Sequence, residues 1–468
     1  ALGNGRRPLR GEGYGGHMLR LYDTAAGAVV PFEPRDPGRV GMYVCGPTVY
    51  APPHLGHGRF SLVFDVLRRY LEWSGFEVDY VSNITDVDDN IVNRAREEGR
   101  SEAEVVEEYE RLWVEAMAGI GVKAPTSDPH ATDYVERMVE FIGELVGGGK
   151  AYETSDGVYF AVESVADYGK LARQDLDTLQ AGARVQVDDD KRSPVDFALW
   201  KRVDDDGSLS WDSPWGRGRP GWHTECVVMS LDLLGEGFDI HGGGQDLAFP
   251  HHENERAQAA AAGRPFAAHW VHNGFIEVGG EKMSKSLGNF TTLADLIEST
   301  DPRAYRLLVL QAHYRSPIEV TPMTTENASK ALAGLDRLAA RAADLPAVSP
   351  DPESVDQLRD RMDDDLDTPA VTALLFTLAK RINALLDDGR ADEAAPLWAA
   401  VGEITTAVGL ELHGEAAEVP ADVLSLAVER DAARAEKDWA RADVIRDQLR
   451  AGGWTVEDTP DGTVVRPG

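Results

Sequence analysis

The alternation of hydrophobic and polar positions first becomes regular between residues 40 and 82. Val40–Cys45 is a short apolar run typical of a buried strand, and a turn rich in glycine and proline follows it. Glu77–Ser82 alternates polar with large apolar residues and is predicted as a second strand. Between them, from about Gly56, apolar residues recur at helical spacing: Val63, Val66, Leu67, Tyr70 and Leu71. The pattern predicts a strand–helix–strand unit, which builds parallel sheets whose ligands bind at the carboxyl ends of the strands.

A second half with a similar pattern begins much later in the chain. Phe238–His241 is predicted as a strand, a helix follows Pro250, and Trp270–Val278 is predicted as another strand. An insertion at about 120–215 separates the halves, and its central part is expected to form a hairpin around Asp156-Gly157. We therefore expect one parallel sheet to which both halves contribute.

Helical patterns dominate after Lys285. Helices are predicted at residues 302–314, 324–345 and about 353–409. Thr368 is expected to cap one of them, with Pro369 in its first turn. The end of the chain combines a helical segment with a hairpin around residues 460–462. One face of that last helix is predicted to be apolar: Trp439, Ala442, Ile445 and Leu449.

The chain is thus predicted to be an α/β protein of several domains. The expected parts are a Rossmann-like parallel-sheet catalytic domain at 18–315 that carries the insertion, an α-helical bundle at 316–412, and a small mixed C-terminal domain at 420–468. Residues 1–17 are glycine-rich and lack the apolar core of a secretion signal, so we expect a disordered extension or tag there.

The charge of the chain is strongly acidic: 80 Asp and Glu stand against 47 Lys and Arg, and the formal net charge is −33. Nucleic-acid binders are usually basic, so this balance argues at first sight against a nucleic-acid partner. A high-salt cytoplasm would also favour an acidic surface and would leave room for a local basic groove. The acidic runs 188–190, 204–206 and 363–365 are expected to be solvated surface. No apolar run approaches membrane-spanning length, and we expect a cytoplasmic protein without membrane contact.

Two short strings carry the type of chemistry that binds a polyphosphate. His54-Leu55-Gly56-His57 places two imidazoles and a glycine at the start of a helix, where free backbone N–H groups and the helix dipole favour anions. Lys282–Ser286, read Lys-Met-Ser-Lys-Ser, places two ammonium groups on a short polar segment. In this order, the two strings indicate nucleotide activation.

The chain has only two cysteines, Cys45 and Cys226, which in a cytosolic protein are more often buried apolar side chains than a disulfide. His251 and Glu255 lie four apart on one face of a predicted helix, a pair that alone is more often a surface hydrogen bond than a ligand pair. If all four converge where the halves of the sheet meet, they suit Zn²⁺. His252 is also a candidate, but we prefer His251 because the next helical residue points about 100° away. Zinc beside an ATP site would recognise a thiolate, which indicates cysteine as the substrate.

At these motifs the chain resembles the cysteinyl-tRNA synthetases, which are class I aminoacyl-tRNA synthetases, and the resemblance runs from Met18 to the C-terminus. It rests on eight segments in the same order: 42–50, 54–57, 83–86, 180–185, 218–226, 241–247, 249–255 and 282–289. The chain departs from the family pattern at Ala51, where relatives often carry an acidic residue, so no role is assigned to that position.

The resemblance implies ATP-dependent ligation of L-cysteine to tRNA(Cys) through a cysteinyl-adenylate. It implies Mg²⁺ with ATP and one zinc ion per chain that coordinates the substrate thiolate, held by Cys45, Cys226, His251 and Glu255. The catalytic residues that it implies are His54, His57, Lys282 and Lys285. It further implies an ATP site that includes His54, Gly56, His57, Gly242, Gly243, Gly244, Asp246 and Lys285.

The family also implies an amino-acid pocket formed by Thr85, Trp222 and His241, and anticodon contacts at Arg434, Asp443 and Asp458. Five of these residues have an ordinary alternative, since Trp222 and His241 could be buried core residues and the three charged residues could be plain surface. Two other functions stay open. A cysteine ligase of mycothiol synthesis shares the zinc site but lacks the C-terminal unit, and a non-catalytic relative would bind tRNA or zinc for regulation.

Overall fold

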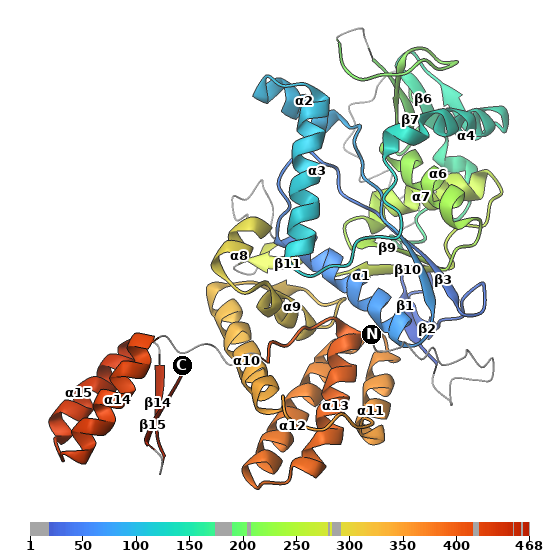
Figure 1. Ribbon diagram of the computed structural model, residues 1–468. Helices are drawn as coiled ribbons and strands as arrows, with labels where there is room; N and C mark the ends of the chain where they lie inside the picture. The colour runs from blue at the N-terminus through green and yellow to red at the C-terminus, as the bar shows by residue number, and fades with distance from the viewer. Residues whose placement is uncertain are drawn as a thin grey trace, which may run out of the picture. The chain divides into compact units, whose positions relative to one another are not determined.

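A computed structural model of the chain (Figure 1) comprises two units, residues 1–334 with 345–412 and residues 335–344 with 413–468. The residues that the structure describes are 18–173, 190–203, 207–278, 281–282, 292–414, 421–452, 454–459 and 462–467. The expected extension at 1–17 and the motif at 180–185 lie outside the described residues.

A four-stranded parallel sheet lies at the centre of the larger unit. Its strands, in spatial order, are β10 (His269–Asn273), β9 (Ile240–Gly244), β3 (Arg39–Val44) and β4 (Glu77–Val81). Helix α1 (Leu55–Trp73) joins β3 to β4, which confirms the predicted strand–helix–strand unit. The chain moves to one side from β3 to β4 and to the other side from β9 to β10, so the strand order reverses between β3 and β9. Ligands of open α/β sheets bind outside the carboxyl ends of the strands at such a reversal.

Helix α1 is buried on nearly every side. It contacts β4 and β9 of the sheet and also α9 (Pro302–Leu310) and α13 (Ala391–Val408). Gly242 of β9 allows the closest approach, since a Cβ there would lie 2.3 Å from Cε1 of Phe64. The N-terminus of α1 is therefore fixed at the carboxyl end of the sheet.

A short antiparallel sheet is formed by three strands of the insertion and one strand that directly follows it. Its strands are β5 (Ala151–Glu153), β6 (Gly157–Phe160), β7 (Phe197–Arg202) and β8 (Gly218–Pro220). The hairpin predicted at Asp156-Gly157 joins β5 to β6. Gly157 is needed there because its φ is 153° and a Cβ would lie 1.9 Å from the carbonyl oxygen of Trp200.

The remaining elements of the larger unit surround these two sheets. The strands are β1 (Arg20–Asp23), β2 (Ala28–Pro31), β11 (Ile276–Val278), β12 (Glu281–Lys282) and β13 (Ile318–Glu319). The helices up to residue 299 are α2 (Asp89–Glu98), α3 (Glu102–Gly119), α4 (Val135–Gly147), α6 (Trp222–Leu234), α7 (Glu253–Ala261) and α8 (Leu293–Ser299), with 3₁₀ turns at Ala131–Tyr134 and Val162–Ser164 and a π-helical turn at Ala248–His252.

The prediction of a single strand at Trp270–Val278 is wrong. The chain leaves the parallel sheet after β10, and β11 joins a different sheet in the order β12-β11-β13. Gly274 makes this crossing possible, because a Cβ at that position would lie 2.6 Å from the carbonyl oxygen of Arg315. Its N–H donates to the carbonyl of Tyr314 at 2.9 Å, so the backbone is held at the point where it changes sheets.

The predicted helices after residue 315 are confirmed as α10 (Pro322–Arg341), α11 (Pro352–Met362), α12 (Thr368–Asp387) and α13. The N-cap of α12 is Asp367, whose side chain accepts from the N–H of Ala370, so the prediction of Thr368 as the cap is wrong by one residue. By length and composition α12 could cross a membrane, with a mean hydropathy of 1.3. However, 44% of the apolar stretch of this helix is buried inside the protein. The helix packs against α11 and α13, as a helix of a folded helical bundle does.

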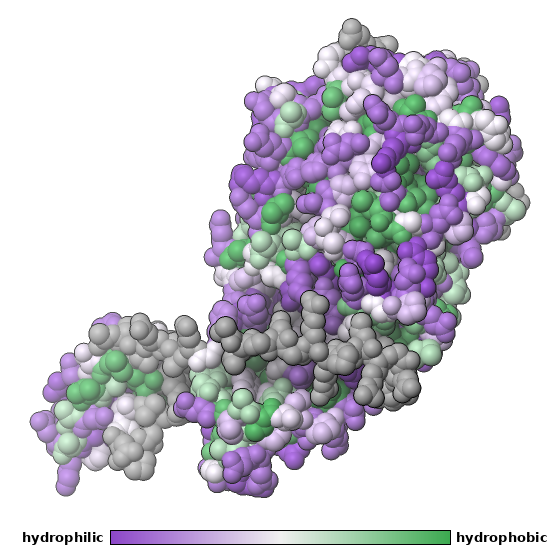
Figure 2. Space-filling model, turned by 45° about the vertical axis from the view of Figure 1, so that its right-hand side comes forward, coloured by the Kyte–Doolittle hydropathy of each residue, from purple (hydrophilic) through white to green (hydrophobic). Residues whose placement is uncertain are grey.

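Hydrophilic residues cover much of the face shown in Figure 2, in keeping with the acidic composition. One acidic run nevertheless departs from the expectation of solvated surface. Asp365 is 3% exposed and forms an ion pair of 2.6 Å with Arg315, and its carboxylate also accepts from the hydroxyl of Tyr314 and the N–H of Tyr22. Residues 188–189 and 204–206 lie outside the described part of the chain.

The smaller unit contains α14 (Ala421–Ala435), α15 (Trp439–Ala451), β14 (Trp454–Thr459) and β15 (Gly462–Pro467). The two strands pair in antiparallel register, which confirms the predicted hairpin. Ala442, Ile445 and Leu449 are buried as predicted, but Trp439 is 59% exposed. It is the first residue of α15, and side chains in a helix lean toward its N-terminus, so its ring lies beyond the packed face.

A buried ion pair ties α1 to the helical part of the larger unit. The guanidinium of Arg306 on α9 lies 2.7 Å from the carboxylate of Asp65 on α1, and both side chains are at most 3% exposed. Arg306 also donates to the carbonyls of Gly121, after α3, and Val408, at the end of α13. Asp65 accepts further from Arg69 at 2.7 Å, so every charge in the group has a partner.

Replacing Arg306 by methionine should destabilise the larger unit strongly, because Asp65 would stay buried without its main counter-charge. We expect the free energy of unfolding to fall by about 3–5 kcal/mol in urea denaturation. The control is Arg303→Met on the same helix, whose ion pair with Asp301 is partly exposed and should contribute at most about 1 kcal/mol. Equal losses in the two variants would contradict this role of the Arg306–Asp65 pair.

Candidate active site

A cavity of about 540 Å³ opens at the carboxyl ends of β3, β9 and β10, at the reversal of strand order. Its lining includes the following predicted site residues: Cys45, His54, Gly56, His57, Trp222, Gly244 and Asp246. Segments from both halves of the chain therefore meet around one space, as the sequence patterns predict.

The string His54–His57 forms the N-terminal cap of α1. Nδ1 of His54 accepts from the N–H of His57 at 3.3 Å, and Nδ1 of His57 accepts from the N–H of His54 at 3.2 Å. The rings stack with centroids 3.7 Å apart. Because each Nδ1 is an acceptor, a neutral ring must carry its proton on Nε2. Both side chains line the cavity, so this cap supplies N–H donors beside the positive end of the helix dipole.

Of the string Lys282–Ser286, the structure describes only Lys282. Lys282 contributes backbone to β12, and Lys285 lies outside the described residues. On the downstream side, Thr292 forms a backbone bridge with His54, and the N–H of Leu293 donates to the carbonyl of Pro53. The described chain on the downstream side of this string therefore begins beside the cap of α1.

Arg59 fixes α1 against the crossing between β10 and β11. Its buried guanidinium donates to the carbonyls of Phe275, Tyr314 and Ser316. Burial lowers the pKa of Arg59 to about 10. The group stays charged at neutral pH and holds the helix beside the backbone at which the chain changes sheets.

The three glycines of β9 have different neighbours. Only Gly244 lines the cavity. A Cβ on Gly242 would meet Phe64, and a Cβ on Gly243 would lie 2.6 Å from Cε1 of His252. Packing against Phe64 and His252 is sufficient to require glycine at Gly242 and Gly243, and their place in an ATP site stays a prediction.

Four buried side chains that could coordinate a metal ion lie together beside this cavity. The Sγ of Cys45 is 3.6 Å from the Sγ of Cys226 and 3.6 Å from Oε1 of Glu255. Nε2 of His251 is 3.6 Å from Sγ of Cys226 and 3.0 Å from Oε1 of Glu255. The end of β3, α6, the π-helical turn and α7 supply one residue each. The convergence expected from the sequence is present.

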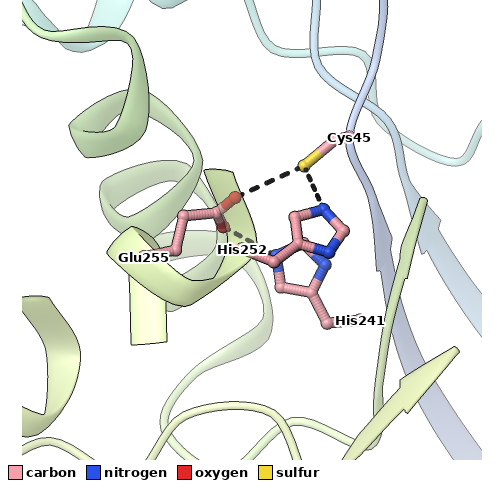
Figure 3. Close-up of side chains that lie close together, drawn as sticks. All are labelled: Cys45, His241, His252 and Glu255. Atoms are coloured by element: carbon pink, nitrogen blue, oxygen red, sulfur yellow. Dashed lines mark hydrogen bonds and ion pairs between the residues drawn. The ribbon is translucent and has the colours of Figure 1, made fainter. Parts of the chain in front are cut away.

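A second set of four overlaps the first (Figure 3). Nε2 of His252 lies 3.3 Å from Sγ of Cys45, and Nε2 of His241 lies 2.7 Å from Oε2 of Glu255. The expectation that His252 points away from the cluster is wrong. Residues 248–252 form a π-helical turn in which Phe249 has a non-helical φ of −144°, so the angular step of an α-helix does not apply.

The chemistry of the first set fits a zinc ion. Two sulfurs, an imidazole nitrogen and a carboxylate oxygen, all within 4.8 Å of one another, match the ligands that Zn²⁺ takes in proteins. Burial raises the pKa of the Cys45 thiol and of the Glu255 carboxyl, and lowers the pKa of the His251 imidazole. A cation that displaces the two protons would therefore stabilise a group of donors that is otherwise costly to ionise.

The predicted amino-acid pocket residues border this cluster. Trp222 stacks on His251 with centroids 4.0 Å apart, and it lines the cavity, so it is not a plain core residue. His241 is fully buried and stacks on Trp270. The hydroxyl of Thr85 donates to Oε2 of Glu225 at 2.9 Å. Glu225 is a buried acid that the sequence analysis missed, although it lies three residues after Trp222 on the same helix.

The predicted anticodon residues all belong to the smaller unit. Arg434 lies on α14, and Asp443 on α15 forms an ion pair of 2.9 Å with Arg446. Asp458 lies on β14. They come from three successive elements of one small fold.

Comparison with known proteins decides the family. Residues 31–330 match the catalytic domain of class I (C) tRNA synthetases, residues 357–413 match a DALR domain, and residues 416–466 match the cysteinyl-tRNA ligase anticodon binding domain. The chain belongs to the cysteine–tRNA ligase family. The cysteine–tRNA ligase of Halorhodospira halophila is 45% identical over 460 residues, which is 96% of this chain and 99% of that protein. That of Methylobacillus flagellatus is 46% identical over 463 residues, with 96% and 100% covered. The chain is therefore an enzyme of the class predicted from its motifs.

Solved structures support the fold of this family member. Methionyl-tRNA synthetase of Mycobacterium tuberculosis in complex with methionyl-adenylate aligns with a TM-score of 0.60 at 14% identity, over 79% of this chain and 90% of that one. At this identity the likeness concerns the fold alone. It confirms the predicted Rossmann-like architecture followed by helices.

The cap of α1 predicts a difference between two substitutions of His54. His54→Ala removes the acceptor for the N–H of His57, and it should lower the free energy of unfolding by about 1 kcal/mol. His54→Asn keeps an acceptor at a position that asparagine favours, and it should lower the free energy of unfolding by only a few tenths of a kcal/mol. Thermal unfolding of both variants beside the wild type measures the difference. Equal stability of the alanine and asparagine variants would show that the Nδ1 contact contributes nothing.

Proposed function

We propose that the protein ligates L-cysteine to tRNA(Cys) in the cytoplasm, through a cysteinyl-adenylate formed from ATP. One observation carries the proposal: Cys45 belongs both to the buried donor cluster and to the lining of the cavity that His54 and His57 border. A group that recognises sulfur and a group that binds phosphate therefore share one space.

The selection of cysteine is assigned to one zinc ion per chain, held by Cys45, Cys226, His251 and Glu255. We prefer this set because it contains both thiols, and thiolates suit Zn²⁺ better than a second imidazole would. When bound, the ion would supply a borderline-soft Lewis acid that coordinates the substrate thiolate. The hydroxyl of serine is harder and less acidic, so it would coordinate the ion more weakly than the thiolate does. His252 and His241 then orient the ligands through their contacts with Cys45 and Glu255.

In the first step, the substrate carboxylate attacks the α-phosphorus of ATP. An O–P bond to the carboxylate forms, the bond to the bridging oxygen breaks, and pyrophosphate leaves with its Mg²⁺. His54 and His57 donate their Nε2–H groups to phosphate oxygens as charge develops, and Gly56 leaves the start of α1 open. Lys285, with Lys282, neutralises the leaving pyrophosphate. Positioning and charge stabilisation are the enzyme's whole contribution.

The substrates are held on the remaining sides of the cavity. Asp246 accepts from the ribose of ATP beside Gly244. Thr85, Trp222 and His241 shape the space for cysteine next to the metal cluster. Two observations support this role of Trp222: its ring stacks on His251, and it lines the cavity.

In the second step, the 2′-hydroxyl oxygen of the terminal adenosine of tRNA attacks the carbonyl carbon of the adenylate. The ester bond forms, the bond from that carbon to the phosphate oxygen breaks, and AMP leaves while its phosphate takes up the hydroxyl proton. We assign catalysis to residues 18–315 with the insertion at about 120–215, support of the tRNA to the bundle at 316–412, and anticodon binding to 420–468. Arg434, Asp443 and Asp458 are the proposed anticodon contacts. The match of residues 416–466 to an anticodon binding domain favours tRNA over an amino sugar as the acceptor.

The function is tested by cysteine-dependent ATP–pyrophosphate exchange followed by charging of total tRNA. The wild type should exchange with cysteine but not with serine and should charge tRNA. Lys285→Ala should reduce exchange by about 10²–10³ while cysteine binding persists, because it removes charge stabilisation only at the leaving group. Lys330→Ala, an exposed lysine paired with Glu326, is the control and should leave exchange unchanged.

Two outcomes would refute this function. Exchange without tRNA charging would favour the amino-sugar ligase, and absence of exchange would favour a non-catalytic relative. Exchange that is unchanged in Lys285→Ala would remove that residue from the mechanism but leave the reaction in place.

The metal assignment predicts opposite behaviour of two variants. Metal analysis of the purified wild type should give about one zinc per chain. Cys226→Ser should lose most of this zinc, whereas His252→Asn should retain it at reduced affinity, as expected for a group that only orients a ligand. His269→Asn is the control, since His269 is a buried imidazole outside both sets. Zinc that is retained in Cys226→Ser and lost in His252→Asn would instead select the set shown in Figure 3.

A further inference from the structure

Asn273 is a buried polar residue without a role in the mechanism above. It ends β10, where its backbone is paired with Gly244 of β9, and it is 4% exposed. It lines the cavity together with Gly244 and Asp246. The residue therefore lies at the carboxyl end of a strand, where the fold places its ligands.

The amide of Asn273 has a defined orientation. Its Nδ2 donates to the carbonyl of Gly274 at 2.9 Å, and the reversed amide would place two oxygens against each other. Oδ1 is consequently directed away from Gly274, and it accepts no hydrogen bond from any residue that the structure describes. A buried acceptor without a donor needs a partner such as water or a ligand. Because Asn273 also lines the cavity, a ligand bound there can supply the missing donor.

The neighbours of Asn273 indicate which part of a nucleotide this partner is. A Cβ on Gly244 would lie 2.6 Å from Oδ1 of Asp246, so Asp246 and Asn273 both lie beside the same glycine. Gly244 has no side chain that would keep a ligand away from either acceptor. Two acceptors beside the same glycine suit a group with two adjacent hydroxyl donors, and in ATP that group is the ribose.

We propose that Asn273 is a nucleotide-binding residue whose Oδ1 accepts a hydrogen bond from a ribose hydroxyl of ATP, beside the contact assigned to Asp246. The inference rests on the proposed use of ATP. The 6-amino group of adenine is the other N–H donor that ATP offers, and the experiment separates it from the hydroxyls.

The test is the preference for ATP over 2′-deoxy-ATP and 3′-deoxy-ATP in cysteine-dependent pyrophosphate exchange. In the wild type, kcat/KM should be about tenfold higher for ATP than for the analogue that lacks the contacted hydroxyl. Asn273→Ala should reduce this preference to within about twofold and leave the KM for cysteine unchanged. Asn273→Asp keeps an acceptor oxygen but loses the donor to Gly274, so it should retain the preference. If Asn273→Ala does not fold, Asn273→Leu fills the same space without an acceptor and replaces it.

Three outcomes would overturn the inference. One is a full preference for ATP over both analogues in Asn273→Ala. Another is that Asn273→Ala loses only the preference for ATP over purine riboside triphosphate, a nucleotide that lacks the 6-amino group. That result would assign Oδ1 to the base. The third is an equal loss in the Ala and Asp variants, which would reduce Asn273 to a support for Gly274. Absence of exchange by the wild type with any nucleotide would refute the proposed function itself.

Discussion

The reversal of strand order between β3 and β9 is the constraint on which the rest of the larger unit depends. It places the carboxyl ends of two adjacent parallel strands beside each other, and the N–H of Cys45 is bonded to the carbonyl of Gly242 across that boundary. From this point the chain turns away in opposite directions, which leaves a crevice between the two connections. The cap of α1 closes one side of the crevice, and the turn before α7 closes the other. Residues that are distant in sequence become neighbours because the sheet allows no other arrangement.

The chemistry of the site follows from how deeply this junction is buried. A thiol, a carboxyl and two imidazoles that are withdrawn from water favour their neutral forms, and such a group gains most from a cation that replaces protons. The cavity beside it is different, because it has N–H donors and a helix terminus that favour anions. The site therefore combines a wall whose side chains could coordinate a cation with a wall whose N–H groups favour an anion. That combination suits a reaction between a thiol-bearing amino acid and a polyphosphate.

The sequence predicted those parts of the fold that depend on local pattern. The periodicity of 40–82 was sufficient for β3, α1 and β4. Residue type and spacing also singled out the two strings that are predicted to bind phosphate and the four potential metal ligands, and the structure brings the four ligands together. The failures have tertiary causes. His252 turns toward Cys45 because the turn before α7 is π-helical, and the strand expected at Trp270–Val278 is divided because Gly274 passes against another segment. Asp365 is buried because Arg315 pairs with it. Asn273 carried no sequence signal, since only its missing hydrogen-bond partner distinguishes it.

The wide spacing of the proposed zinc ligands has a consequence for synthesis of the chain. Cys45 leaves the ribosome 210 residues before Glu255. At translation rates of about 5–20 residues per second, this delay is roughly 10–40 seconds. During that time the nascent chain holds a thiol that has neither its metal nor the walls that later enclose it. A zinc ion held by the proposed set would therefore be acquired late in synthesis, after the second half of the sheet has emerged. Early oxidation of Cys45 would then leave a finished chain without one of its two proposed sulfur ligands.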